Sequence, residues 1–159
     1  MKSMARILVL LIVIASMAAV ICAQGATPVL ASTESTPGLP QLSPEELVKI
    51  LQAPGEKPLI FQVGFHVLYV QVHIPGSEYV GPGSDEAGLQ LLLKRVALSP
   101  KNQFIVLYCG CCPWTHCPNV KPAYEKLRAQ GFTNVKVLYI PDNFGTDWVD
   151  KGYPVAKGE

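Results

Sequence analysis

Three mainly apolar runs, separated by segments with helical spacing, constrain the fold of this chain more than any other feature. They occupy residues 59–63, 104–108 and 135–140. A short run without polar alternation is typical of a strand buried on both faces of a sheet. Strands that alternate with helices predict a parallel sheet, so the fold class expected here is α/β.

The segments between these runs carry helix signals. Ser43-Pro44-Glu45-Glu46 provides an N-cap, a proline at the first helical position and a glutamate three residues after the cap. Leucines and a valine at helical spacing predict a second helix near residues 89–96, and a third is expected from about Pro118 to Gln130. A short last helix is expected to carry Trp148, whereas the residues between the first buried strand and His73 are expected to form a loop.

The N-terminus has the layout of a secretory signal peptide. Lys2 and Arg6 precede an apolar stretch from Ile7 to Ile21, and the small residue Ala23 follows. We therefore expect a signal peptide at residues 1–23, a flexible linker at 24–41 and one folded domain at 42–159. The protein is then periplasmic or secreted, and its cysteines meet an oxidising compartment. An uncleaved membrane anchor is the alternative, and it is the only membrane contact expected.

The charge balance argues against a nucleic-acid partner. The chain has 13 Lys+Arg and 12 Asp+Glu, a formal net charge of +1, and no cluster of basic residues. Proteins that bind nucleic acids depend on neutralising phosphates with such clusters.

Cysteines are concentrated in one turn after the second apolar run. Four of the five cysteines lie within the nine residues from Cys109 to Cys117. A sulfur at the end of a strand and before a helix faces backbone N–H groups and the positive end of the helix dipole, which lower a thiol pKa. Cys109 is therefore expected to be a nucleophilic thiolate, and the loop that follows it to Thr115 is long enough to surround the sulfur.

Two other interpretations of the cluster are weaker. A disulfide framework spreads its cysteines to join distant segments, which this sequence does not do. Cys109 and Cys112 have CxxC spacing, and His116-Cys117 adds two potential metal ligands, but structural zinc sites usually use two pairs from separate elements. We therefore expect no metal site.

Three segments, in order, resemble the rhodanese-like (sulfurtransferase) domain family over about residues 42–155. They are the turn His73-Ile74-Pro75-Gly76-Ser77, the strand ending in Tyr108-Cys109, and a closing pattern of Gly131-Phe132, Val135 to Leu138, Trp148 and Gly152-Tyr153-Pro154-Val155. The resemblance implies a three-layer α/β/α fold with a mainly parallel central sheet. The chain resembles, in particular, exported members of the family that have a CxxC active-site loop.

The resemblance implies that Cys109 carries sulfane sulfur as a persulfide, taken from a small donor such as thiosulfate and passed to a thiol acceptor. The acceptor thiol can belong to a partner protein. No cofactor is implied, because the sulfur travels on the protein. Cys112 is the second expected catalytic residue, as a resolving thiol. The expected substrate-binding residues are Gly110, Cys111, Pro113, Trp114, Thr115 and His116.

This sequence departs from the family pattern where the family binds an anionic donor. Trp114 and Thr115 stand where the active-site loop usually has an arginine, and Gln62-Val63-Gly64 replaces the usual Asp-Val-Arg. Thiosulfate need not be the donor. Two further functions stay open: a thiol–disulfide oxidoreductase that uses Cys109 and Cys112, and a non-enzymatic metal-binding or redox-sensing domain.

Overall fold

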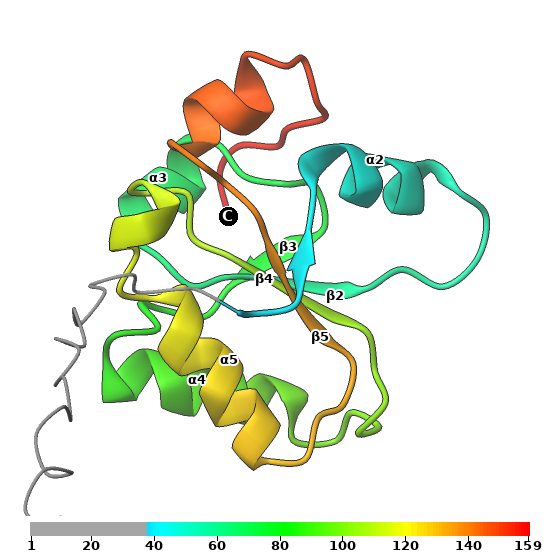
Figure 1. The fold of residues 1–159 in the computed structure, drawn as a ribbon, viewed down its shortest axis with the longest axis vertical. Coiled ribbons are helices and arrows are strands. Elements are labelled where there is room, and N and C mark those ends of the chain that lie inside the picture. The colour runs from blue at the N-terminus through cyan, green and yellow to red at the C-terminus, as the bar shows by residue number, and fades with distance from the viewer. Residues whose placement is uncertain (1–37) are drawn as a thin grey trace, which may run out of the picture. The chain divides into compact units, whose positions relative to one another are not determined.

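A computed structural model describes residues 38–159, so the predicted signal peptide and most of the predicted linker lie outside the described residues. The described chain forms one five-stranded sheet in which every pair is parallel (Figure 1). The strand order is β1-β5-β4-β2-β3. The predicted α/β class with a parallel central sheet is confirmed. The strands are β1 (Gln41–Leu42), β2 (Leu59–Gln62), β3 (Ser77–Tyr79), β4 (Ile105–Tyr108) and β5 (Val135–Leu138).

The helices are α2 (Pro44–Gln52), α3 (His66–Gln71), α4 (Glu86–Val96) and α5 (Val120–Ala129), with a 3-10 turn η1 (Trp114–His116) and a π-helical turn η2 (Gly145–Val149). Helix α2 begins as predicted. Ser43 Oγ accepts from the Glu46 amide at 3.2 Å, and the Glu46 carboxylate accepts from the Ser43 amide at 2.8 Å. None of the helices within residues 38–159 has the length and apolar character that crossing a membrane requires.

Helices cover both faces of the sheet, so the core has two halves. On one face, Ile105 and Leu107 pack with residues of α4 and α5. On the other face, Val106 and Tyr108 pack with α2, η2 and the segment before β3. Figure 1 shows α4 and α5 together on one side and α2 on the other. Alternate residues of β4 point to opposite faces, and both faces are covered by helices, so all four residues of the strand are buried and apolar, as predicted.

Some expectations for local structure were wrong. The segment expected to be a loop before His73 contains α3, whose Tyr69 is buried and donates its hydroxyl to the Ser77 carbonyl at 2.6 Å. This tertiary contact outweighs the weak helix propensity of the β-branched residues around it. Strands β1 and β3 have only two and three residues, too few to show a period in the sequence. Gln41, expected in the linker, already pairs with Val137.

The packing of Trp148 gives a test of the second half of the core. Trp148 is fully buried, stacks on Phe144 at 5.8 Å between ring centroids, and donates Nε1–H to the Pro154 carbonyl at 2.8 Å. Trp148→Ala should lower the free energy of unfolding by about 3–5 kcal/mol, because it removes a large core side chain. Urea unfolding under reducing conditions measures this. Leu98→Ala, at a fully exposed position, is the control and should change stability by less than about 0.5 kcal/mol.

Candidate active site at the end of β4

The sheet topology places the cysteine cluster at a position suited to ligand binding. The chain runs outward from β2 to β3 on one side and from β4 to β5 on the other, so the order reverses between the neighbours β2 and β4. In open α/β sheets, ligands bind beyond the carboxyl ends of the strands at such a switch point. Cys109 directly follows β4, and the Val63 amide donates to the Tyr108 carbonyl beside it at 2.8 Å.

The alternation of side chains along β4 decides which face of the sheet Cys109 points to. Tyr108 belongs to the core half that contains η2, so the next residue, Cys109, joins the opposite half with Cys117 and Val120 at the start of α5. Cys109 and Cys117 are each only 3% exposed, whereas Cys111 and Cys112 are partly exposed. The cluster therefore has a buried pair and an accessible pair of thiols.

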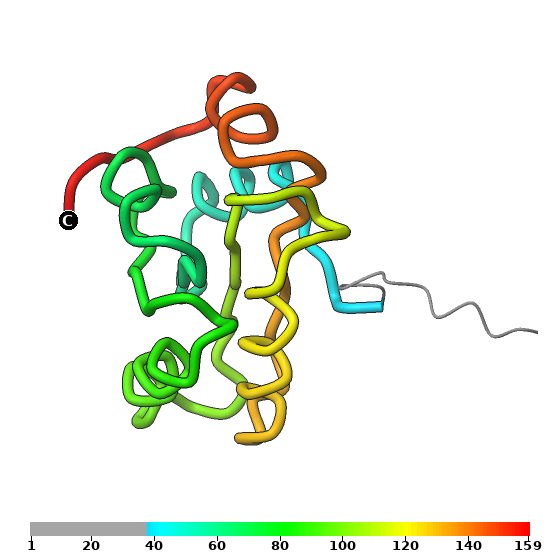
Figure 2. Tube along the Cα trace, turned by 90° about the vertical axis from the view of Figure 1, so that its left-hand side faces the viewer, coloured from blue at the N-terminus to red at the C-terminus, as the bar shows by residue number. Residues whose placement is uncertain are grey.

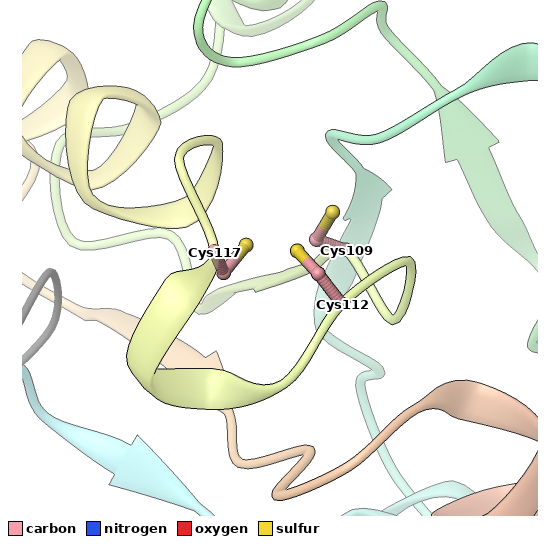
Figure 3. A group of neighbouring side chains, drawn as sticks. All are labelled: Cys109, Cys112 and Cys117. Atoms are coloured by element: carbon pink, nitrogen blue, oxygen red, sulfur yellow. The ribbon is translucent and has the colours of Figure 1, made fainter.

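All four sulfur atoms lie close together. The Sγ atoms of Cys109 and Cys111 are 2.9 Å apart, and those of Cys111 and Cys112 are 3.3 Å apart. The Sγ atoms of Cys109, Cys112 and Cys117 all lie within 4.8 Å of one another (Figure 3). In Figure 3, the side chains of Cys112 and Cys117 point toward each other from the two ends of the loop. The structure thus brings together the predicted residues Cys109, Cys111 and Cys112 and adds Cys117.

Asn119 is a buried polar contact of this cluster. It is 1% exposed, its Oδ1 accepts from the Ser84 amide at 3.1 Å, and its Nδ2 donates to Cys109 Sγ at 3.3 Å. The bond to Ser84 fixes the orientation of the amide group, so that its N–H points at the sulfur. A donor held in this way stabilises negative charge on Cys109, or on a sulfur attached to it.

Gln62 holds the beginning of the cysteine loop from the neighbouring strand. Its buried side chain donates to the Cys109 carbonyl at 3.3 Å and accepts from the Gly64 amide at 3.0 Å. A Cβ at Gly64 would lie 2.9 Å from Cys109 Sγ, so only glycine leaves room for the sulfur there. The residues that depart from the family pattern at 62–64 therefore support Cys109 directly.

The distribution of negative charge differs from the prediction. The pKa of Cys111 is lowered to about 6, first by the hydrogen bond from Cys109. The pKa of Cys117 is also lowered to about 6, by a bond from Cys109 and by the backbone amides of Asn119 and Val120. The pKa of Cys109 is raised by its hydrogen bonds to Cys111 and Cys117 and by burial, and burial raises that of Cys112. These shifts favour negative charge on Cys111 and Cys117, whereas the sequence alone placed it on Cys109.

The loop at residues 110–115, which was expected to surround the Cys109 sulfur, only partly faces it. The Trp114 amide donates to the Pro141 carbonyl at 2.9 Å, and the His116 amide donates to the Pro113 carbonyl at 2.9 Å. Neither N–H group is therefore directed at the sulfur of Cys109. Pro113, Thr115 and His116 are exposed, and Thr115 Oγ1 lies 2.9 Å from His116 Nδ1. The Gly110 carbonyl accepts from the Phe144 amide at 3.0 Å, which joins the loop to η2 (orange in Figure 2).

A cavity of about 310 Å³ opens beside the cluster. It reaches Cys109 and Cys111 between α3 and the start of η2, and it is large enough for a small substrate. Its other lining side chains are apolar or uncharged, and among them Gln71 and Asn143 offer polar groups. The remaining lining residues are Gln62, Leu68, Val72, Tyr108, Gly110, Phe144 and Gly145.

Sequence reasoning missed three residues of the site. Gln62 was noted only as a departure from a family pattern, and Asn119 was not considered. Cys117 was considered only as a potential metal ligand. A signal existed for Asn119, since a polar residue follows Cys117-Pro118 at the expected start of a helix, but its burial depends on the packing of α5 against Gly83.

Comparisons with known proteins agree with this geometry. The family model for the rhodanese-like domain matches residues 43–139. No curated protein matches the chain in sequence. Similar solved structures include the Alr3790 protein from Anabaena sp. (21% identity, TM-score 0.57, 74% of this chain and 92% of that chain) and the BH2092 protein from Bacillus halodurans (20%, 0.58, 74% and 77%). The Saccharomyces cerevisiae single-domain sulfurtransferase RDL2 is also similar (17%, 0.53, 74% and 94%).

Gly110 tests how tightly the loop is held against η2. Its φ is +71°, and a Cβ there would lie 2.7 Å from Phe144 Cβ. Gly131 also has a positive φ, of +87°, but a Cβ there meets no atom within 4 Å. Gly131→Ala should cost about 1–2 kcal/mol of stability for the backbone alone, and Gly110→Ala should cost more. Urea unfolding compares them, and equal losses would contradict the contact.

The pKa shifts predict different alkylation of two adjacent thiols. Cys111 should react with iodoacetamide at a rate that rises from about pH 5 and levels off above pH 7, because its pKa is lowered to about 6. Cys112, whose pKa is raised, should react only at alkaline pH. No Lys or Arg separates the four cysteines, so fragment-ion mass spectrometry must locate the label. Equal rates at pH 7 would contradict the charge distribution.

Proposed function

Because this chain belongs to the rhodanese-like domain family, we propose that it is a sulfurtransferase that carries sulfane sulfur as a persulfide on Cys109. The observation that carries the proposal is the place of Cys109, which follows the central strand β4 and lines an open cavity. One similar structure belongs to a protein described as a sulfurtransferase, the yeast RDL2.

In the first half of the reaction, Cys109 attacks the outer sulfur of a persulfide donor. During the attack the proton of the Cys109 thiol passes to the Cys111 sulfur, which lies 2.9 Å away and already shares a hydrogen bond with it. A new S–S bond forms on Cys109, the donor's S–S bond breaks, and the donor leaves as a thiolate. The persulfide on Cys109 then receives the hydrogen bond that Asn119 Nδ2 directs at this sulfur.

In the second half, an acceptor thiolate attacks the outer sulfur and Cys109 leaves as a thiolate. Without an acceptor, Cys112 attacks the inner sulfur of the persulfide, which forms a Cys109–Cys112 disulfide and releases sulfide. The two sulfur atoms lie within 4.8 Å of each other, so this step needs little movement of the loop. A reducing thiol, from a small molecule or a partner protein, then restores the two thiols.

The lining of the cavity favours a donor with little charge. Its side chains include no Lys, Arg or His, and the lowered pKa of Cys111 places a negative charge at its inner end. A dianion such as thiosulfate therefore meets repulsion without a compensating cation. We expect an organic persulfide, with at most one negative charge on its sulfur, to be a better donor than this dianion.

The sequence supports a place for this reaction outside the cytoplasm. The basic start and apolar stretch at residues 1–23 support export to the periplasm or secretion. An oxidising compartment makes the return of the Cys109–Cys112 disulfide to thiols dependent on a reductant.

Transfer of sulfane sulfur from an organic persulfide tests the proposal, measured as thiocyanate with cyanide as acceptor or as sulfide with a thiol as acceptor. Cys109→Ser should lower kcat/KM by at least about 100-fold, because the sulfur carrier is lost. Cys112→Ser should keep transfer to an added acceptor but lose sulfide release without one. Intact mass after reaction with the donor should rise by about 32 mass units in Cys112→Ser. Equal activity of wild type and Cys109→Ser would overturn the proposal.

The donor prediction is tested separately. The wild-type kcat/KM for an organic persulfide should exceed that for thiosulfate by at least about 10-fold, as expected from one uncompensated charge interaction of about 1.4 kcal/mol. High salt should raise the thiosulfate rate and leave the rate with a neutral donor unchanged. A thiosulfate rate that equals the persulfide rate would contradict the proposed role of the uncharged lining.

A further inference from the structure

Three of the four clustered cysteines form a triangle of sulfur atoms. Cys109 comes from the end of β4, Cys112 from the loop and Cys117 from the residue after η1, and their Sγ atoms all lie within 4.8 Å of one another. Thiolates at about 2.3 Å from a metal ion in a trigonal plane lie roughly 4 Å apart. Shifts of less than about 1 Å therefore bring the triangle to metal-binding geometry. We propose that Cys109, Cys112 and Cys117 bind one soft, thiophilic metal ion, of which Cu(I) is the best fit.

A small cavity lies against these three residues. Its volume is about 10 Å³, close to the space of a single water molecule or ion. The rest of its lining is mainly apolar and comes from the loop, α5 and the end of β5. These lining residues are Gly110, Trp114, Val120, Leu138 and Ile140. Space for one atom beside three sulfurs is a second observation that points to a bound ion.

Hydrogen bonds around the triangle suit metal-bound thiolates. The backbone amides of Asn119 and Val120 donate to Cys117 Sγ, and Asn119 Nδ2 donates to Cys109 Sγ at 3.3 Å. Such outer contacts orient ligands and offset their negative charge. Binding releases the remaining thiol protons to solvent, with no change in oxidation state.

The number of available ligands decides between ions. Zinc in proteins takes four ligands in a tetrahedron, and within residues 38–159 no His, Asp or Glu joins the three sulfurs, while Cys111, which contacts Cys109 and Cys112, does not belong to the group within 4.8 Å. His116 is exposed and its Nδ1 lies 2.9 Å from Thr115 Oγ1. The apolar lining leaves no room for a shell of water. Soft thiolate ligands select Cu(I), which is stable with three of them. This geometry is the reason to revise the expectation of no metal site.

The proposed metal site does not depend on the proposed sulfurtransferase function, but a bound metal ion would affect that function. An ion held by Cys109 and a persulfide on Cys109 exclude each other, so bound Cu(I) should inhibit sulfur transfer.

The test is anaerobic titration of the reduced full-length protein with Cu(I) against a chromophoric Cu(I) chelator. Wild type should take one equivalent. Cys112→Ser and Cys117→Ser should each weaken binding by at least about 100-fold, as loss of a metal ligand does. Cys111→Ser is the matched control, since Cys111 is adjacent to Cys112 but outside the triangle, and it should still take one equivalent. Zn(II) at equal concentration should not displace Cu(I).

X-ray absorption of the wild-type complex is a measurement that does not depend on whether a variant folds. It should show three sulfur ligands and no nitrogen or oxygen ligand. The proposal is overturned by absence of stoichiometric binding, by a nitrogen or oxygen ligand, or by equal losses in Cys111→Ser and Cys117→Ser. If Cu(I) fails to bind while sulfur transfer remains, only the metal site is lost. If Cu(I) binds and no donor is consumed, only the sulfurtransferase proposal is lost.

Discussion

The parallel pairing of β4 between β2 and β5 is the constraint on which the site depends. Strand β4 is buried on both faces, so the alternation of its side chains cannot slip by one residue without exchanging the two halves of the core. This register sends Tyr108 toward η2 and Cys109 toward the start of α5. It also aligns Gln62 with Tyr108, which brings the Gln62 side chain to the Cys109 carbonyl.

Crowding of four thiols divides them into different chemical roles. Thiolates repel one another at these distances, so a cluster with 2.9 Å and 3.3 Å separations lowers the pKa of some thiols only by raising that of others. The pKa values of Cys111 and Cys117 are lowered because the Cys109 S–H, which can bond to one of them at a time, and nearby backbone amides favour their charged forms. In the proposed mechanism Cys109 is the nucleophile, and its proton moves to the Cys111 sulfur 2.9 Å away when it attacks.

The two proposals place different chemistry on the same cluster. The larger cavity reaches Cys109 and Cys111 from the side of α3, whereas the small cavity touches Cys109, Cys112 and Cys117 from the side of α5. Cys109 belongs to both, and the proposals for sulfur and for metal therefore compete for one sulfur atom. The alternative of a thiol–disulfide oxidoreductase is not favoured, because the family match is to a rhodanese-like domain.

The sequence by itself determined the α/β class, the buried character of β2, β4 and β5, and the place of Cys109 after a strand. These follow from local periodicity and from the length of apolar runs, which depend on neighbours along the chain. Tertiary structure alone decided the short strands β1 and β3, the helix α3, and the roles of Gln62, Asn119 and Cys117. The direction of a side chain and the pKa of a thiol depend on atoms brought close by packing from distant parts of the chain, and spacing in the sequence does not encode them.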